Sequence, residues 1–92
     1  MNASDSILEQ LRGREVVVDA TSPFVLLGTL SAYDEKYLVL DQADVHDLRD
    51  TTTTRENYVV DSKRLGIRVN RERALVRIDE IVSLSALEDV VV

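Results

Sequence analysis

The chain has 92 residues, of which 45% are hydrophobic and 30% charged, enough for one compact domain over residues 1–92 and too few for two. Its net charge of -6 argues against indiscriminate attraction to nucleic acid or anionic membrane. The sequence has no cysteine, which excludes disulfides, so packing or self-association must stabilise it. It shows no basic-then-apolar leader and no apolar run near the roughly 18 residues of a membrane span, so we expect a soluble, cytoplasmic protein without a membrane partner.

Residues 5–12 are predicted to form a short N-terminal helix. Ser6 precedes Glu9 by three residues, the spacing of a capping box, in which the two side chains satisfy backbone amides of the first turn. Three apolar residues then recur at helical spacing before a glycine: Ile7, Leu8 and Leu11. We expect this helix to pack across one end of the fold.

Three consecutive antiparallel strands are predicted next, because β-branched and apolar runs alternate with turn signals. The strands cover residues 16–18, 24–33 and 37–45, and the turns between them cover residues 21–23 and 34–35. Gly28 lies inside the second strand, where glycine marks a sharp bend, a bulge or the close approach of another backbone. A sharply bent strand is what a small barrel requires.

A polar break at residues 47–54, with four threonines in a row, precedes a predicted helix at about residues 54–65. The signals at its two ends agree: a capping-box pair Thr53 and Glu56, C-terminal cations Lys63 and Arg64, and a C-cap glycine, Gly66. A strand is the alternative, because residues 58–60 have high β propensity.

Shorter strand-like segments fill the rest of the chain. They cover residues 67–69, 74–78 and 81–84, separated by residues 70–73 and 79–80. The last six residues combine apolar and acidic side chains and either pack on the barrel or fray. These elements predict an all-β domain with short helices: a five-stranded, strongly bent small barrel with an N-terminal helix and a helical insertion between strands 3 and 4.

Two segments resemble the paired motifs of the Sm and Sm-like (LSm, Hfq-type) proteins. The first, residues 24–43, reads FVLLGTLSAYDEKYLVLDQA and is similar to the family's apolar-x-Gly-x-apolar pattern followed by an Asp, here Asp34. The second, residues 74–84, reads ALVRIDEIVSL, with Arg77 matching the Arg of the family's Arg-Gly pair. Residues 11–18 are similar to the family's exit from helix to first strand. The order and spacing of these segments support one another.

The resemblance implies an Sm-like, SH3-like barrel that forms a ring of six or seven subunits, or a smaller homo-oligomer, with RNA bound at the pore. Pairing edge strands between subunits removes unpaired edges, which are a liability of small open barrels. By the resemblance, Tyr37 would stack on a base, Lys36 would contact phosphate and Arg77 would close the pocket. The competing interpretation makes Tyr37 a strand residue at the barrel mouth and Lys36 a solvated turn residue. We expect Asp34 to be structural, accepting backbone amides in its turn.

The sequence departs from the family pattern in three places. No Asn stands in the loop after Asp34, Ile78 replaces the Gly after Arg77, and residues 47–73 form an insertion. With the acidic net charge, these departures favour a second function, an Sm-fold module for protein interaction that has lost base-specific RNA binding. Such a module would dock its partner through the inserted helix and the acidic, apolar C-terminus.

The basic residues are concentrated in one stretch, because residues 63–77 hold six basic side chains and one acidic side chain. This stretch favours RNA binding. The candidates for a phosphate-contacting patch are Arg64, Arg68, Arg71 and Arg73. The alternative is a solvated basic face that pairs with acidic neighbours.

Nothing in the sequence indicates an enzyme. His46 is the only histidine, and it alternates in face with Asp47, so no third metal ligand or catalytic partner is apparent. The chain also lacks a glycine-rich phosphate loop and a nucleophile arrangement. We therefore expect no catalytic residue, no metal and no cofactor.

Overall fold

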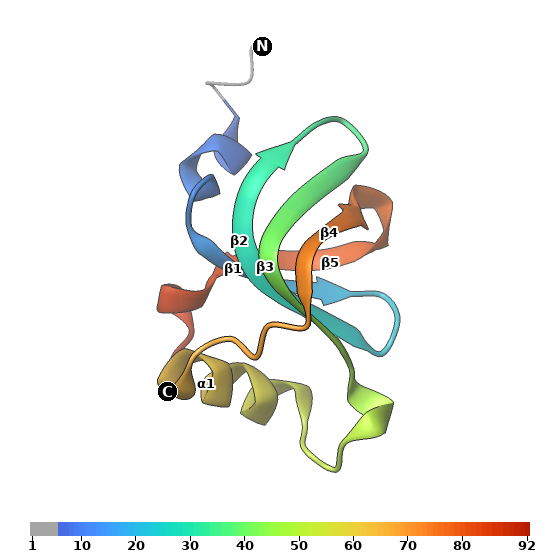
Figure 1. Ribbon diagram of the computed structural model, residues 1–92, viewed down its shortest axis with the longest axis vertical. Coiled ribbons are helices and arrows are strands. Elements are labelled where there is room, and N and C mark those ends of the chain that lie inside the picture. Colours follow the sequence, from blue (N-terminus) through green and yellow to red (C-terminus); the bar gives the residue numbers. More distant parts are fainter. Residues whose placement is uncertain (1–5) are drawn as a thin grey trace.

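The computed structural model describes residues 6–92 as one strongly bent five-stranded sheet with a single α-helix at one end (Figure 1). The principal elements are β1 (Glu15–Ala20), β2 (Phe24–Tyr33), β3 (Tyr37–Asp47), α1 (Arg55–Leu65), β4 (Arg71–Arg77) and β5 (Ile81–Ala86). Short 3-10 turns lie at Ile7–Leu11, Leu48–Asp50, Ile78–Glu80 and Leu87–Asp89. No helix within residues 6–92 is long and apolar enough to cross a membrane.

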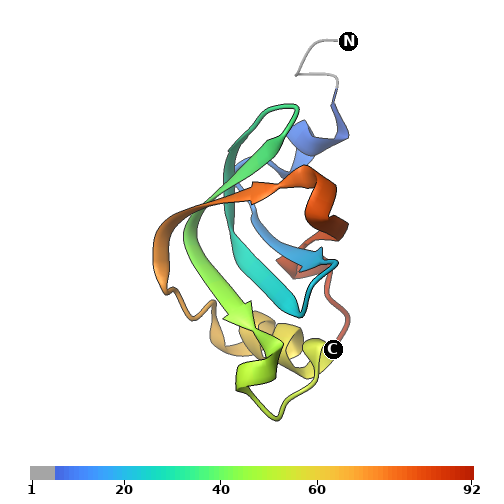
Figure 2. The same cartoon turned by 90° about the vertical axis from the view of Figure 1, so that its right-hand side faces the viewer.

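All strand pairs are antiparallel, in the order β4-β3-β2-β1-β5. The sheet curls on itself without closing, so that β4 and β5 form its two edges (Figure 2). The prediction of a five-stranded, strongly bent small barrel with a helical insertion between the third and fourth strands is confirmed.

Gly28 allows β2 to bend against β3. A Cβ at this position would lie 3.1 Å from the Asp41 carbonyl oxygen and 3.2 Å from the Ala43 Cα. The register between the two strands shifts at the same point, between Leu27 and Thr29. Of the predicted roles of Gly28, the close approach of another backbone and the irregularity in the strand are confirmed, because a Cβ at this position would press on the backbone of β3 where the register shifts.

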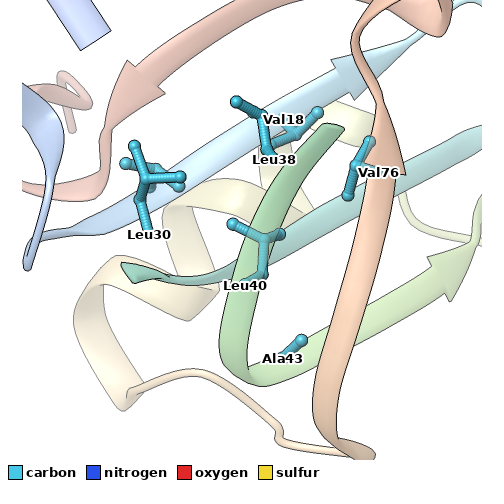
Figure 3. Packing of buried hydrophobic residues seen from close by; sticks show 7 residues of the cluster. Val18, Leu30, Leu38, Leu40, Ala43 and Val76 are labelled. Carbon is cyan, nitrogen blue, oxygen red and sulfur yellow. The ribbon is translucent and has the colours of Figure 1, made fainter. Parts of the chain in front are cut away.

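Two apolar clusters lie on opposite faces of the sheet. Figure 3 shows part of the inner cluster, which consists of Val16, Val18, Leu30, Leu38, Leu40, Ala43 and Val76. The outer cluster consists of Val17, Val25, Leu27, Tyr58, Val59 and Leu87. Successive side chains of a strand point to opposite faces. The three consecutive valines of β1 are thus all buried, since the inner cluster covers one face of β1 and α1 covers the other.

The short N-terminal helix predicted over residues 5–12 is a 3-10 helix, Ile7–Leu11. Residue 5 lies outside the described residues. Ser6 caps the element by accepting from the Leu8 amide at 3.1 Å. Glu9 does not complete the predicted capping box, because its carboxylate accepts from the Tyr33 hydroxyl at 2.8 Å and pairs with Arg12. The expected packing against the barrel is confirmed, since apolar side chains of this element contact the inner cluster.

The helix in the insertion is confirmed, and the strand alternative for it is wrong. Its N-cap is Thr54 rather than the predicted Thr53, and the Thr54 hydroxyl accepts from the Asn57 amide at 3.1 Å. Gly66 ends the helix with φ of 97°, as its C-cap position predicts. Lys63 in the last turn donates to the carbonyls of Glu88 and Val90, which holds the C-terminal tail against α1.

The strand predicted at residues 67–69 is wrong, and β4 begins at Arg71 instead of residue 74. The Asn70 side chain explains the difference. Its Oδ1 accepts from the Val45 amide and its Nδ2 donates to the Val45 carbonyl, both at 3.0 Å. The Asn70 side chain thus makes the two hydrogen bonds to Val45 that the backbone of a longer β4 would otherwise make. At the other end, Ile78 leaves the predicted strand for the 3-10 turn before β5.

A buried polar group anchors α1 to the sheet. Asp44 on β3 is 1% exposed and accepts from the Tyr58 hydroxyl of α1 and, at 3.2 Å, from the Asn70 side chain. The His46 ring stacks on the Tyr58 ring with centroids 3.9 Å apart and an angle of 6° between the planes. The Arg68 guanidinium lies 5.4 Å from the centroid of the Tyr58 ring. Burial and the Asp44 carboxylate raise the pKa of Tyr58 to about 12.

We expect Gly28→Ala to lower the free energy of unfolding by about 1–3 kcal/mol, because the added methyl group overpacks against the backbone of β3. Urea denaturation of the wild type and the variant measures this loss. An unchanged midpoint would contradict the close approach.

We expect Tyr58→Phe to lower the free energy of unfolding by about 1–3 kcal/mol at neutral pH, because the buried Asp44 carboxylate loses a donor. The raised pKa of Tyr58 contributes stability that is complete below about pH 10 and is lost as the pH rises towards about 12. Denaturation at several alkaline pH values should therefore show a shallower decline for Tyr58→Phe. Tyr37→Phe, whose ring is exposed, is the matched control and should decline as the wild type does.

Candidate nucleic-acid interface

The β2–β3 turn and the start of the β4–β5 turn form one open cleft. Tyr37 at the start of β3 is the register partner of Arg77 at the end of β4, so the two side chains leave the same face of the sheet. The Ile78 amide donates to the Lys36 carbonyl at 2.8 Å and joins the two turns. The cleft has a volume of about 390 Å³ and is lined by Glu35, Lys36, Tyr37, Arg77, Ile78 and Asp79.

The structure thus brings together the three residues that the sequence predicts for base binding: Lys36, Tyr37 and Arg77. The β2–β3 turn, which contains Lys36 and leads into Tyr37, lies at the end of the molecule opposite α1 (Figure 1). The insertion therefore leaves this turn uncovered.

Asp34 shapes the wall of the cleft. Its Oδ1 accepts from the backbone amides of Lys36 and Tyr37, both at 2.8 Å, and its own amide donates to the Tyr37 carbonyl at 3.0 Å. The amides of Lys36 and then Tyr37 lower the pKa of Asp34. The predicted structural role of Asp34 is confirmed, because it closes the turn that presents the other two residues.

The charges that line the cleft balance. Two acidic side chains, Glu35 and Asp79, lie beside two basic ones, Lys36 and Arg77. Arg77 donates to Asp79 at 2.8 Å, but both side chains are more than 60% exposed, and such pairs contribute only about 0–1 kcal/mol. The Tyr37 side of the cleft is open, since this residue is 36% exposed. Because its charges balance and an aromatic ring lines it, the cleft suits a flat, neutral ring better than a doubly charged anion.

Ile78 stands where the resembled family has glycine, and the core accommodates its side chain. Ile78 is half-buried and packs against the inner cluster. It also lines a small apolar pocket together with Leu8, Leu38, Ile81 and Leu84. Its side chain thus joins the floor of the barrel mouth while part of it forms a wall of the cleft.

The four arginines predicted as a phosphate-contacting patch do not share one environment. Arg73 donates to the Asp41 carboxylate at 2.9 Å, and this ion pair lowers the pKa of Asp41. Arg64, Arg68 and Arg71 lie in the last turn of α1, in the following segment and at the start of β4, and all three are exposed.

Sequence reasoning did not find the polar group formed by Asp44, Tyr58 and Asn70. No local signal indicates it, because the three residues come from β3, α1 and the segment between α1 and β4. His46, considered above as a ligand, stacks on Tyr58 instead. Within residues 6–92, no group of three or more His, Asp or Glu side chains is arranged to hold a metal ion.

No protein-family model matches this sequence, and no curated protein matches it. Among solved structures, the Sm protein of Pyrococcus abyssii, determined in complex with a uridine heptamer, is similar to this chain. The match has a TM-score of 0.60 and 17% sequence identity and covers 94% of this chain and 99% of the Sm protein. At this identity the likeness concerns the fold alone. The five-stranded bent sheet is thus the Sm fold predicted from the paired motifs.

Proposed function

We propose that this protein is an Sm-like, ring-forming protein that binds single-stranded RNA through the cleft of Lys36, Tyr37 and Arg77. One observation carries the proposal: an exposed tyrosine and an arginine are register partners at the mouth of an open cleft. The Sm protein that shares the fold was solved with a uridine heptamer, which adds support from the architecture.

The chemistry of the cleft fits an unpaired base. A base stacks on an aromatic side chain whatever its identity, and an arginine adds a cation–π contact or hydrogen bonds to the base edge. Tyr37 supplies the ring and Arg77 the guanidinium, while Lys36 is the nearby cation for a phosphate. No asparagine lies in the turn, so we propose discrimination by stacking and by Arg77 rather than by a side-chain amide.

The two free sheet edges support assembly of several copies. β4 exposes Leu75 (59%) and β5 exposes Val82 (68%), which are unusual exposures for aliphatic strand residues. The charges of the two edges are complementary. β4 carries Arg73 and Arg77, and β5 is flanked by Asp79, Glu80, Glu88 and Asp89. We propose that β4 of one subunit pairs with β5 of the next, a head-to-tail contact that closes into a ring.

The second candidate function is a protein-interaction module that uses the α1 end. It is favoured by three exposed apolar residues there and in the tail: Leu65 (77%), Val91 (90%) and Val92 (63%). Much of the tail already serves the fold, because Leu87 is buried and Lys63 holds the tail backbone. The RNA proposal is therefore the stronger of the two.

We expect light scattering to give a mass several times that of the 10.3 kDa chain. Val82→Lys should reduce it towards the monomer, because it places a cation on the β5 edge that would face the arginines of β4. Leu65→Lys is the matched control, an equally exposed aliphatic residue away from both edges, and it should leave the mass unchanged. A monomeric wild type would refute the ring.

We expect saturable binding of short uridine-rich RNA, measured by fluorescence anisotropy at low and near-physiological salt. Tyr37→Ala should weaken it by about 1–3 kcal/mol because a stacked base loses its platform, whereas Tyr37→Phe should retain it. Arg77→Ala should weaken binding by a similar amount of about 1–3 kcal/mol if Arg77 touches a base. Absence of binding even at low salt would instead support the protein-interaction module.

A further inference from the structure

The arginines of this protein divide into two groups by their partners. Nine arginines lie within residues 6–92, and six of them pair with a carboxylate. The paired ones are Arg12, Arg14, Arg49, Arg55, Arg73 and Arg77. The other three have no carboxylate partner among the described residues: Arg64, Arg68 and Arg71. They follow one another along the chain with no other arginine between them. In a chain with 17 acidic residues, three neighbouring unpaired arginines are available for an external anion.

The three unpaired arginines, which we call the arginine segment, are carried by an anchored part of the insertion. Arg68 is held over the Tyr58 ring, and Tyr58 is bonded to the buried Asp44. Arg71 donates to the Asn70 carbonyl at 3.1 Å, and the Asn70 side chain is locked onto β3. Arg64 lies in the last turn of α1. All three residues are exposed, although they belong to a part of the chain that is tied to the sheet, so binding an anion would require little ordering of the backbone.

Arg71 and the cleft lie at opposite ends of the β3–β4 pair, and Arg64 and Arg68 precede Arg71 in α1 and in the segment that follows it. Arg77 is the register partner of Tyr37, and Arg71 is the register partner of Ala43. Six residue steps of β4 separate Arg71 from Arg77, which corresponds to about 20 Å at 3.3 Å per residue. Single-strand binding sites of OB-fold domains cover roughly 4–16 nucleotides, a length that can span this distance, so one RNA strand can reach both Arg71 and the cleft.

A polyanion fits this segment better than the cleft does. The cleft has two acidic and two basic side chains, whereas residues 63–72, which contain the arginine segment, have four basic side chains and one acidic one. In a protein of net charge -6, affinity for a phosphate backbone must come from a local positive surface. Guanidinium groups bind phosphate through paired, charge-assisted hydrogen bonds.

We infer that Arg64, Arg68 and Arg71 form a second RNA contact, which binds the phosphate backbone of a strand whose base occupies the cleft. The inference rests on the proposed function and adds to it that base and phosphate are bound at two different places. The cleft stacks the base, and the arginine segment supplies the salt-dependent part of the affinity for longer strands.

The test compares two triple variants that remove the same charge. Arg64→Gln/Arg68→Gln/Arg71→Gln changes the arginine segment, and Arg12→Gln/Arg14→Gln/Arg49→Gln removes three arginines that already have carboxylate partners. Each is titrated with oligouridines of about five and about fifteen nucleotides over a range of salt. The segment variant should bind the longer strand at least about 10-fold more weakly, with a salt slope smaller by about 2, since each phosphate contact on a single strand contributes about 0.7. Its affinity for the shorter strand and both affinities of the control should stay unchanged.

The outcomes separate this inference from the proposed function. If Tyr37→Ala weakens binding and the segment variant does not, the cleft stands and the second contact is refuted. If the segment variant alone weakens binding of the longer strand, the arginine contact stands and the base cleft is refuted. If the wild type binds poly-glutamate through the segment and binds no RNA, the partner is an acidic protein, and both proposals fail.

A charge-conserving variant distinguishes loss of phosphate contacts from loss of the folded structure. Arg64→Lys/Arg68→Lys/Arg71→Lys should keep most of the salt slope, because lysine also neutralises phosphate. The circular dichroism spectra of all variants should superimpose on that of the wild type. A lysine variant that binds the longer strand as weakly as the glutamine variant would overturn the assignment of these residues to phosphate contacts and leave them a structural role.

Discussion

The buried carboxylate of Asp44 is the interaction on which the inserted segment depends. A carboxylate inside a protein is costly unless it is hydrogen-bonded, and Asp44 takes its side-chain donors from Tyr58 and Asn70. These two residues lie on either side of the turn that ends α1. The bonds to Asp44 therefore tie both the helix and the following segment to the middle of β3, and the helix covers the outer face of β1 and β2 as a result.

The bonds to Asp44 also fix where the segment between α1 and β4 lies relative to β3. β3 and β4 run side by side from the α1 end to the cleft, and each end presents a different chemistry. At one end Asp34 closes the turn that presents Tyr37 next to a balanced set of charges. At the other end, unpaired arginines follow the anchored residues Tyr58 and Asn70. The two ends of the β3–β4 pair therefore present an exposed aromatic ring at one end and exposed arginines at and near the other.

Local sequence signals predicted the elements whose formation depends on neighbours in the chain. The strands 24–33 and 37–45, the close backbone approach at Gly28 and the helix near residues 54–65 are all confirmed, with end points that differ by a few residues. The predictions are wrong where a residue distant in the sequence determines the local structure. Residues 67–69 have the composition of a strand, yet the Asn70 side chain occupies the edge of β3 that a longer β4 would use. Glu9 has the spacing of a cap, yet it bonds to Tyr33 from β2.

The sequence by itself determined the strand order and the sharply bent small sheet, because these follow from residue periodicity and turn signals, whereas the three candidates for base binding came from the resemblance of two segments to the Sm motifs. Only the tertiary structure decided which charges are paired. The stretch at residues 63–77 has a uniform basic composition, but Arg73 and Arg77 meet carboxylates supplied by β3 and by the following turn, while Arg64, Arg68 and Arg71 meet none within the described chain. Three of the six ion pairs join residues two or three positions apart, but Arg14, Arg55 and Arg73 pair with carboxylates of distant segments, and chain spacing does not encode those distances.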